Sequence, residues 1–381
     1  MVSRMRPKLA YLVTEDWYFL SHRLPMARAA RHAGFDVHVL ARVGDCRRLI
    51  EAEGFVLHAL DWQRRDGSFV NLAAAVVQIR KVLRGINPAV LHNIALKPAI
   101  IGGMAATGLT GIAVANNING LGSGYLAAGL NGRLQRLALS AGLLGLLNRR
   151  RTLTVVQNPA DFAALCSLGL PERRLRLIAG SGVDTDRLQP APELPLPLTV
   201  TYVGRLLADK GLRSLMAAHR IVRQRGHSIN LSLAGTPDPQ NATSIPQAEI
   251  DAWAHEPGVT LLGHVTDIAA LWAQSHIAVL PSRREGLPLS LLEASACGRP
   301  MIATDVPGCR DVVRHGETGL LVPVDQPVPL ADAIVQLAND PALRRRMAQA
   351  ARKRAETEFS AEVVADQIAA LYRGLASGQI A

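Results

Sequence analysis

Two glutamates, Glu285 and Glu293, are separated by seven residues in the segment REGLPLSLLEASACGRP, which runs from Arg284 to Pro300. The apolar run between them predicts a helix packed in the protein interior. A buried carboxylate is costly unless a cation or a hydrogen-bond donor satisfies it. Two interpretations are open. Either Glu285 caps the helix and Glu293 pairs with a basic residue such as Arg299, or both carboxylates bind polar groups of a ligand.

The turn between the glutamates has the composition of an anion site. It consists of Gly286, Leu287, Pro288 and Leu289. Proline is favoured in the first turn of a helix, so the backbone N–H groups around Leu287 to Leu289 would point at a bound anion. In that arrangement Glu285 contacts a polar group beside the phosphate. Glu293, over a turn into the helix, reaches a ribose diol.

A second segment, YVGRLLADKG, runs from Tyr202 to Gly211 and brings two cations to the end of an expected strand. Gly204 permits a tight exit from the strand, and Arg205 and Lys210 follow it. A planar Arg fork and a Lys point charge together suit a diphosphate. A solvated basic loop is the commoner fate of such residues, so this segment alone does not establish a site.

Short apolar runs alternate with helical patterns along the chain, which predicts an α/β fold of parallel sheets covered by helices. The expected strands are KLAYLVT, FDVHVLAR, AVLHNI and GIAVANN, then LTVTYVGR, INLSLAG, VTLLG, IAVLPS, PMIAT and GLLVP. Prolines near Pro190 to Pro197 predict a linker. We expect doubly wound domains at 1–180 and 199–358, a linker at 181–198, and a helix at 359–381 that packs back toward the first domain. Ligands of such folds bind at the carboxyl ends of the strands.

The composition narrows the class of protein. The 381 residues exceed one ordinary core, and a net charge of +11 favours an anionic partner such as a nucleotide, a phospholipid surface or nucleic acid. Four scattered cysteines without a CxxC pair indicate reduced thiols, and the amino terminus lacks the apolar core of a signal peptide. No stretch has the length of a membrane span. These features predict a cytoplasmic protein.

Four segments occur in the order and spacing of glycosyltransferase family 4 of the GT-B superfamily: IAGSGVDTDRLQP, GRLLADKG, PSRREGLPLSLLEASACGRPMIATDVPG and HGETGLLVP. The resemblance covers nearly the whole chain. It implies two Rossmann-like domains facing across a cleft, and a nucleotide-diphosphate sugar, in the first instance a UDP-sugar, as donor. It implies that Arg205 and Lys210 neutralise the diphosphate, while Glu285 contacts the sugar and Glu293 the ribose.

The resemblance also implies a reaction. The anomeric configuration is retained, and the leaving diphosphate helps to deprotonate the acceptor hydroxyl, with no metal ion and no other cofactor. The segment DTD, Asp184 to Asp186, imitates an Asp-x-Asp metal motif. Its place before a proline-rich stretch, beside Arg187, predicts a helix cap or a turn instead.

In this architecture the amino-terminal domain binds the acceptor. The segment EDWYFLSHRLP after the first strand is expected to be a loop, and it resembles the loop of enzymes that extend polyprenyl-diphosphate-linked sugars. The resemblance indicates Arg23 and Lys97 as contacts for acceptor phosphates. His22 and His92 are more often satisfied loop or core histidines than bases, although His92 is expected to end a strand that faces the cleft.

Asn117 and Asn119 stand where many family members place a histidine. This departure resembles a bacterial subgroup that builds capsule, O-antigen or glycoprotein glycans on lipid carriers. It leaves the acceptor-side base unassigned, so the donor phosphate would have to do that work.

The run GRLQRLALSAGLLGLLNRRR predicts a helix around 133–151 with an apolar face and basic flanks. Such a helix suits an anionic membrane surface. The alternative is an ordinary core helix with a basic carboxyl end. With the overall charge and a lipid-linked saccharide as acceptor, we expect peripheral association with the inner face of the cell membrane.

Other functions fit the strand–helix pattern less well. A dinucleotide-dependent oxidoreductase would need a G-x-G-x-x-G turn where the sequence reads TEDWYF. A nucleic-acid-binding protein is disfavoured by 4% aromatic content and scattered basic residues, and no nucleic-acid partner is expected. A phosphorylase would have a much longer chain. A sugar-nucleotide epimerase or hydrolase of the same fold is the closest rival, and it would act without an acceptor.

Overall fold

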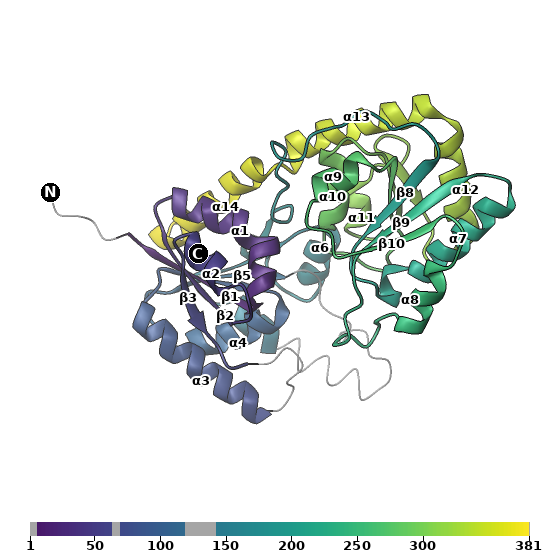
Figure 1. Ribbon diagram of the computed structural model, residues 1–381. Coiled ribbons are helices and arrows are strands. Elements are labelled where there is room, and N and C mark those ends of the chain that lie inside the picture. Colours follow the sequence, from purple (N-terminus) through teal and green to yellow (C-terminus); the bar gives the residue numbers. More distant parts are fainter. Residues whose placement is uncertain (1–5, 63–68, 119–141, 381) are drawn as a thin grey trace. The chain divides into compact units, whose positions relative to one another are not determined.

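The computed structural model describes residues 6–62, 69–118 and 142–380, which form two compact α/β units (Figure 1). Unit 1 consists of Met1–Ser181 together with Glu362–Ala381, and unit 2 consists of Gly182–Ala361. The stretch expected to be a free linker thus belongs almost entirely to unit 2. The last helix, α14 (Ala361–Ser377), belongs to unit 1 over nearly its whole length.

Unit 1 is built on a seven-stranded parallel sheet in the order β3-β2-β1-β4-β5-β6-β7. Its strands are β1 (Lys8–Glu15), β2 (Asp36–Arg42), β3 (Val56–Ala59), β4 (Val90–Ile94), β5 (Ala113–Ile118), β6 (Thr152–Val156) and β7 (Leu175–Leu177). Its other helices are α1 (Asp16–His32), α2 (Arg47–Ala52), α3 (Phe69–Ile86), α4 (Leu96–Ala106), α6 (Pro159–Ser167) and the 3-10 turn η2 (Glu172–Arg174).

The alternation of side chains along β1 explains how helices come to cover both faces of this sheet. Leu9 and Tyr11 pack with residues of α1 and α14, including Tyr372, on one face. Ala10 and Leu12 pack with residues of α3 and α4 on the other face. Because successive strand residues point to opposite faces, an unbroken apolar run such as KLAYLV must be buried on both sides.

Unit 2 is built on a six-stranded parallel sheet in the order β10-β9-β8-β11-β12-β13. Its strands are β8 (Leu198–Val203), β9 (Ile229–Ala234), β10 (Val259–Gly263), β11 (Ile277–Leu280), β12 (Met301–Thr304) and β13 (Gly319–Val322). Its helices are η3 (Ala208–Lys210), α7 (Leu212–Gln224), α8 (Gln247–Ala254), α9 (Ile268–Ala273), α10 (Leu289–Ala296), α11 (Cys309–Val312), α12 (Pro327–Asn339) and α13 (Pro341–Glu358). The prediction of two doubly wound domains is confirmed.

Both sheets reverse their winding direction at one point, between β1 and β4 in unit 1 and between β8 and β11 in unit 2. Loops that leave neighbouring strands there diverge to opposite faces, which opens a crevice at the carboxyl ends of the strands. The two motifs with the strongest chemical signal, after Val203 and after Leu280, follow the two strands at the switch point of unit 2.

The segment from Glu15 to Pro25 is helical, not a loop as the sequence predicted. Helix α1 begins at Asp16 and continues through Pro25 to His32. Phe19 and Met26 of this helix are fully buried in the core of unit 1. This tertiary burial outweighs the local cost of a proline inside the helix.

Residues 133–141 of the expected surface helix at 133–151 lie outside the described residues, which resume at 142. Its described end packs inward, with Leu147 fully buried in a core cluster of unit 1. Arg149 donates hydrogen bonds to the Gly103 carbonyl oxygen at 3.0 Å and to Thr107 Oγ1 at 2.7 Å. This end therefore has the character of a core helix, contrary to the expectation of a membrane-facing surface. None of the described helices is both long and apolar enough to cross a membrane.

Candidate active site

The two motifs of unit 2 meet at the switch point because their loops pack backbone against backbone. Gly211 has φ of 72°, and a Cβ atom there would lie 1.9 Å from the Pro281 carbonyl oxygen, so only glycine fits. The Arg283 N–H donates to the Asp209 carbonyl oxygen at 2.9 Å. The loop after β8 and the loop after β11 are thereby held together.

Lys210 and Glu285 form an ion pair at this junction. Lys210 Nζ lies 2.5 Å from Glu285 Oε1, and Ser282 Oγ donates to the same oxygen at 2.6 Å. The two side chains are 21% and 11% exposed, so the pair is largely screened from water yet reachable from one side. Glu285 does not cap the helix, because the N-cap of α10 is Pro288. Its carboxylate is instead positioned by a cation and a hydroxyl.

The loop that carries Glu285 packs closely against a second glycine, Gly308. Gly308 has φ of 81°, and a Cβ atom there would come within 2.5 Å of the Gly286 carbonyl oxygen. Pro288 N-caps α10, which begins at Leu289, one residue later than a first-turn proline would imply. The turn from Gly286 to Leu289, including Leu287, therefore leads directly from the Glu285 carboxylate into the positive end of a helix.

Arg205, the other expected diphosphate contact, is exposed and pairs elsewhere. Its guanidinium lies 2.7 Å from Asp238 Oδ2, and Gly204, which precedes it, directly follows the last residue of β8, Val203. The carbonyl oxygen of Arg205 accepts a hydrogen bond from the buried Tyr202 hydroxyl at 2.8 Å. The backbone of Arg205 is therefore fixed, whereas its side chain can exchange one anionic partner for another.

Glu293 lies on α10 and has no ion pair or side-chain hydrogen bond within the described part of the chain. Burial raises its pKa from 4.5 to about 7, and the charge of Arg187 offsets only part of that rise. Arg299 does not pair with it, because the Arg299 guanidinium donates to the carbonyl oxygen of Ala191 at 3.0 Å. The interpretation of Glu293 as half of an ion pair with Arg299 is therefore wrong. A desolvated, unpartnered carboxylate is a mark of a ligand site.

The Asp-x-Asp segment forms a turn. Asp184 Oδ1 accepts hydrogen bonds from the N–H groups of Asp186 and Arg187 at 3.2 and 2.9 Å. Its carboxylate is thus occupied by the backbone, as the sequence predicted for a cap or turn. Over the described ranges, no three His, Cys, Asp or Glu side chains are grouped as a metal site requires.

Comparison with known proteins matches both halves of the chain. Residues 197–340 match a family model described as glycosyl transferases group 1, and residues 8–154 match one described as glycosyl transferase 4-like. The chain belongs to these glycosyltransferases. The predicted resemblance to family 4 is confirmed.

Individual relatives of this glycosyltransferase include enzymes of capsule and glycan synthesis. CapM, the capsular polysaccharide biosynthesis glycosyltransferase of Staphylococcus aureus, is 32% identical over 173 residues, which make up 45% of this chain and 45% of CapM. The chain thus spans about half the length of that relative. The N,N'-diacetylbacillosaminyl-diphospho-undecaprenol alpha-1,3-N-acetylgalactosaminyltransferase of Campylobacter jejuni is 23% identical over 376 residues, which cover 93% of this chain and 97% of that protein.

The fold matches that of a solved structure over its full length. The crystal structure of HepE from Anabaena in complex with UDP-glucose superposes with a TM-score of 0.78 at 18% identity, and the match covers 97% of this chain and all of HepE. At this identity the likeness concerns the fold alone. It confirms the GT-B assignment made from the sequence motifs.

In unit 1 of the glycosyltransferase, the carboxyl end of β1 is tied to the loop after β2. Asp16 is 1% exposed, and its Oδ2 accepts hydrogen bonds from the N–H groups of Gly44 and Cys46 at 2.6 and 3.2 Å. His22, further along α1, lies with its ring stacked on Tyr18 at 4.4 Å between centroids. The neighbouring Trp17 is 45% exposed, which leaves an aromatic surface at the start of the helix.

Arg23 is not at the surface, contrary to the expectation that it contacts acceptor phosphates. The side chain is 1% exposed and donates to Ser181 Oγ at 3.2 Å. In this structure the guanidinium offers no surface to an acceptor, so its role is structural.

His92 is a core residue in the middle of β4 rather than at its end. It is fully buried, and its Nδ1 lies 2.6 Å from the hydroxyl of Tyr372 in α14. Burial lowers the pKa of His92 to about 3, so the ring is neutral at physiological pH. His92 therefore joins α14 to the sheet as a core residue with a low pKa, although its Nε2 has no hydrogen-bond partner among the described residues.

Lys97 follows the carboxyl end of β4, and Asn117 lies at the carboxyl end of the neighbouring strand β5. Lys97 is in the first turn of α4, with its ammonium 5.8 Å from the centroid of the Trp62 ring. Ala95, the N-cap of α4, has a strained φ of 82°, and its N–H donates to the Asn117 carbonyl oxygen at 2.8 Å. The amide group of Asn117 is buried and has no hydrogen-bond partner in the described part of the chain. Asn119 lies outside the described residues.

Sequence reasoning missed three residues of the unit 2 site. Ser282 orients Glu285, Asp238 holds Arg205, and Arg187 is the cation that acts on Glu293. Ser282 could have been found, since it is three residues before Glu285 at the end of a strand. The other two come from loops whose approach depends on the tertiary fold.

Proposed function

We propose that this glycosyltransferase transfers a sugar from a nucleotide-diphosphate donor, with UDP as the nucleotide, to a polyprenyl-diphosphate-linked saccharide. The reaction retains the anomeric configuration and needs neither a metal ion nor another cofactor. The observation that carries the proposal is the cluster of Lys210, Glu285 and Ser282 at the switch point of unit 2, next to the positive end of α10.

In the proposed site the cations of unit 2 bind the donor diphosphate. Lys210 has three N–H donors, so its ammonium can hold Glu285 and a phosphate oxygen together. Arg205 exchanges Asp238 for the diphosphate, because an exposed ion pair is weak and opens at little cost. Negative charge that develops on the leaving phosphate is then met by fixed positive groups, which is the main catalytic effect such a site can supply.

The two glutamates bind the rest of the donor in this proposal. Glu285, fixed by Ser282, accepts hydrogen bonds from the sugar hydroxyls and orients the anomeric carbon. Glu293 accepts from the ribose diol, which gives its desolvated carboxylate the partners that the protein itself does not provide. The donor phosphate takes the proton of the acceptor hydroxyl, because His92 is fully buried with its pKa lowered to about 3, which makes it a weak base, and the amide of Asn117 cannot act as a base.

The acceptor is assigned to unit 1. The assignment is supported by the Campylobacter relative, whose name gives a diphospho-undecaprenol-linked saccharide as its acceptor, and by CapM, whose name gives capsule synthesis. Lys97 in the first turn of α4 is the proposed contact for the acceptor phosphate, and exposed Trp17 is a surface on which a sugar ring can stack. Peripheral association with the inner membrane face follows from such an acceptor and from the charge of +11, not from residues 142–151.

The proposal is tested by Glu285→Gln in an assay of nucleotide release with UDP-sugars and a polyprenyl-diphosphate disaccharide. The amide keeps the shape but loses the charge, so we expect kcat to fall roughly 100-fold or more. Glu317→Gln removes an exposed carboxylate from the same unit and should leave kcat unchanged. Thermal melting should show both variants folded.

Two outcomes would count against the proposal. Wild-type turnover by Glu285→Gln would remove Glu285 from the site. Nucleotide release that is just as fast without any acceptor would favour the alternative function, a sugar-nucleotide epimerase or hydrolase.

A further inference from the structure

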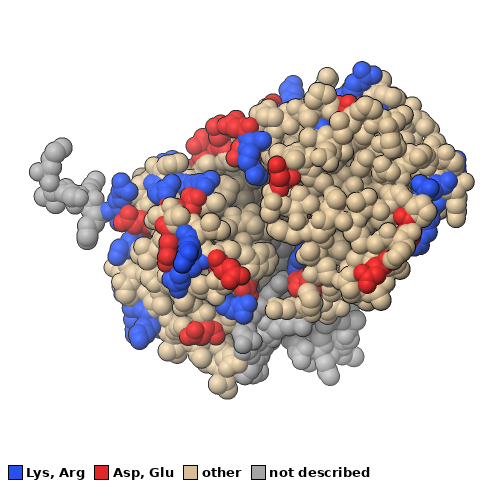
Figure 2. Space-filling view, viewed as in Figure 1, with Lys and Arg blue, Asp and Glu red and all other residues tan. Residues whose placement is uncertain are grey.

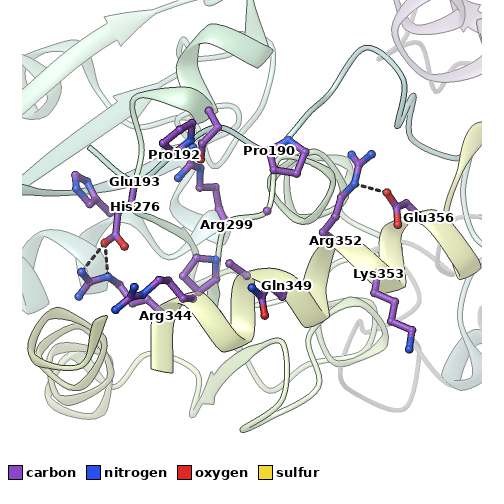
Figure 3. A pocket seen from close by; sticks show the side chains of 15 residues that line it. Pro190, Pro192, Glu193, His276, Arg299, Arg344, Gln349, Arg352, Lys353 and Glu356 are labelled. Carbon is purple, nitrogen blue, oxygen red and sulfur yellow. Dashed lines mark hydrogen bonds and ion pairs between the residues drawn. The ribbon is translucent and has the colours of Figure 1, made fainter. Parts of the chain in front are cut away.

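A pocket of about 440 Å³ opens in unit 2, away from the site described above (Figure 3). One wall is the chain segment 190–193, and the opposite wall is the face of α13 that carries Arg345, Gln349 and Lys353. The floor includes His276 and residues 298–300. Its volume lies in the range of roughly 300–1,000 Å³ that is typical of small-molecule sites.

The pocket lies at the other edge of the sheet from the donor site. His276 immediately precedes β11, and Pro300 immediately precedes β12, whereas Ser282 and the donor loops follow the ends of their strands. A four-residue strand such as β11 spans roughly 13 Å at about 3.3 Å per residue. A ligand in this pocket is therefore separate from a donor nucleotide at the switch point.

Two arginines of the pocket, Arg344 and Arg352, each pair with a carboxylate and donate to backbone carbonyl oxygens. Arg344 pairs with Glu193 at 2.5 Å and donates to the Leu337 carbonyl oxygen at 2.6 Å. Arg352 pairs with Glu356 at 2.6 Å and also donates to backbone carbonyls, including that of Leu188. Both ion pairs are drawn as dashed lines in Figure 3. These contacts fix the segment 190–193 against α13 and keep the pocket open.

Three further cations have no carboxylate partner among the residues that the structure describes. Arg299 is only 3% exposed; it donates to the Ala191 carbonyl oxygen, and its Nε has no hydrogen-bond partner. Arg345 and Lys353 are exposed on α13, with Arg345 bonded only to a carbonyl oxygen of its own helix. The lining thus holds five cations, Arg299, Arg344, Arg345, Arg352 and Lys353, against the two carboxylates of Glu193 and Glu356. This excess of positive charge attracts an anion to the pocket.

The remaining surface of the pocket is apolar and rigid. It is formed by Pro190, Pro192 and Pro300 with Ala191 and Ala348. A fully hydrated inorganic anion would leave these surfaces unused, and a neutral sugar would leave the three unpaired cations unused. The two features together match one ligand class, an anion attached to an apolar or planar group.

We propose that this pocket of unit 2 is a second ligand site, which binds a phosphate monoester or diester that carries an apolar or planar group. The phosphate contacts Arg299, Arg345 and Lys353, and the organic group packs on the prolines. Two sources supply this chemistry, a soluble organic phosphate and the headgroup of an anionic lipid. The site does not depend on the proposed transferase mechanism, because it shares no residue with the donor site.

The experiment titrates the full-length protein with phenyl phosphate and follows the heat of binding. The paired variant Arg345→Ala/Lys353→Ala removes two exposed cations and should weaken binding at least tenfold. The control Arg346→Ala removes a neighbouring exposed cation of α13 that does not line the pocket, and its affinity should equal that of the wild type. A second control, Arg205→Ala/Lys210→Ala, disables the donor site and should also retain binding.

Further measurements distinguish the two sources of the ligand and define the results that would reject the proposed site. Vesicles of phosphatidylglycerol in phosphatidylcholine replace phenyl phosphate in a sedimentation assay, with pure phosphatidylcholine vesicles as blank. Binding of either probe that is lost in the α13 pair variant supports the site and names its source. The proposal is overturned if neither probe binds, if binding is lost in the donor-site variant instead, or if inorganic phosphate binds as tightly as phenyl phosphate.

Discussion

The raised pKa of Glu293 makes a prediction about the stability of unit 2. The carboxyl ionises near pH 7 in the folded protein and near 4.5 in the unfolded chain, so between these values the folded state holds a proton that the unfolded state has released. Stability therefore falls as pH rises from 4.5 to 7. At about 1.4 kcal/mol per pKa unit, the loss above pH 7 is at most about 3 kcal/mol.

Glu293→Gln removes this penalty because the amide stays neutral at every pH. We expect the variant to gain about 3 kcal/mol of stability relative to wild type at pH 8, over and above any difference at pH 5. Urea unfolding at the two pH values measures this change, with intrinsic fluorescence as the signal. Trp253 and Trp272, both buried in unit 2, report on the unit concerned. Glu317→Gln, at an exposed carboxylate, should show the same difference from wild type at both pH values.

The same group should couple nucleotide binding to pH. If UDP binds only the ionised carboxylate, its affinity for the wild type rises about tenfold between pH 6 and pH 8, because the ionised fraction rises by that factor around a pKa of 7. Glu293→Gln retains only the pH dependence of the phosphate itself, so the difference between the two proteins isolates Glu293. Equal stability changes at pH 5 and pH 8, together with parallel affinity profiles, would refute the reasoning.

Three further predictions concern other groups. Lys210→Ala should weaken UDP binding at least tenfold, measured by calorimetry, and should lower kcat, measured by turnover. The control Lys353→Ala should change neither quantity. Unchanged UDP affinity in Lys210→Ala would contradict the assignment of Lys210 to the donor diphosphate. Excess chelator should leave the transfer rate unchanged, and a loss restored by Mg²⁺ would reopen a metal role. Because burial depresses the pKa of His92 to about 3, the free energy of unfolding should fall as pH drops below 6.5, by about 2 kcal/mol at pH 5. His92→Gln should flatten this pH dependence in thermal melts. An unaltered pH dependence in the variant would argue against a role for His92.

The sheets were predictable from the sequence, and the limits of that prediction have local causes. Long apolar runs such as those of β1 and β8 mark strands buried on both faces. The missed strands are β3, β6 and β7. Of these, β3 and β7 are edge strands of four and three residues in which exposed positions interrupt the apolar pattern. The part of helix α1 from Asp16 to Pro25 was predicted as a loop because Pro25 and the clustered aromatics look like one, and only the packing of the whole unit stabilises a helix there.

The site residues were largely identified from motifs, but their partners were not. Lys210 and Glu285 were both expected to bind the donor, yet in the structure each is bound to the other, because the approach of two loops 75 residues apart is set by the sheet. The error over Glu293 and Arg299 was avoidable. Arg299 lies beyond the end of α10 at Ala296, so helical spacing does not bring its side chain beside Glu293.

The charges at the two switch points support the proposed assignment of the donor to unit 2. Both sheets have the same strand order up to their sixth strand, so the backbone offers an anion-binding crevice in each. In unit 1, the Asp16 carboxylate occupies the end of β1 and takes up the N–H groups of Gly44 and Cys46 that a phosphate would need. In unit 2 the corresponding place holds Lys210 and, nearby, Arg205. Asp16→Asn should therefore not create a nucleotide site, because its amide oxygen still accepts those N–H groups and no cation replaces Lys210. These contacts support the proposal that the nucleotide diphosphate of the donor binds at the switch point of unit 2.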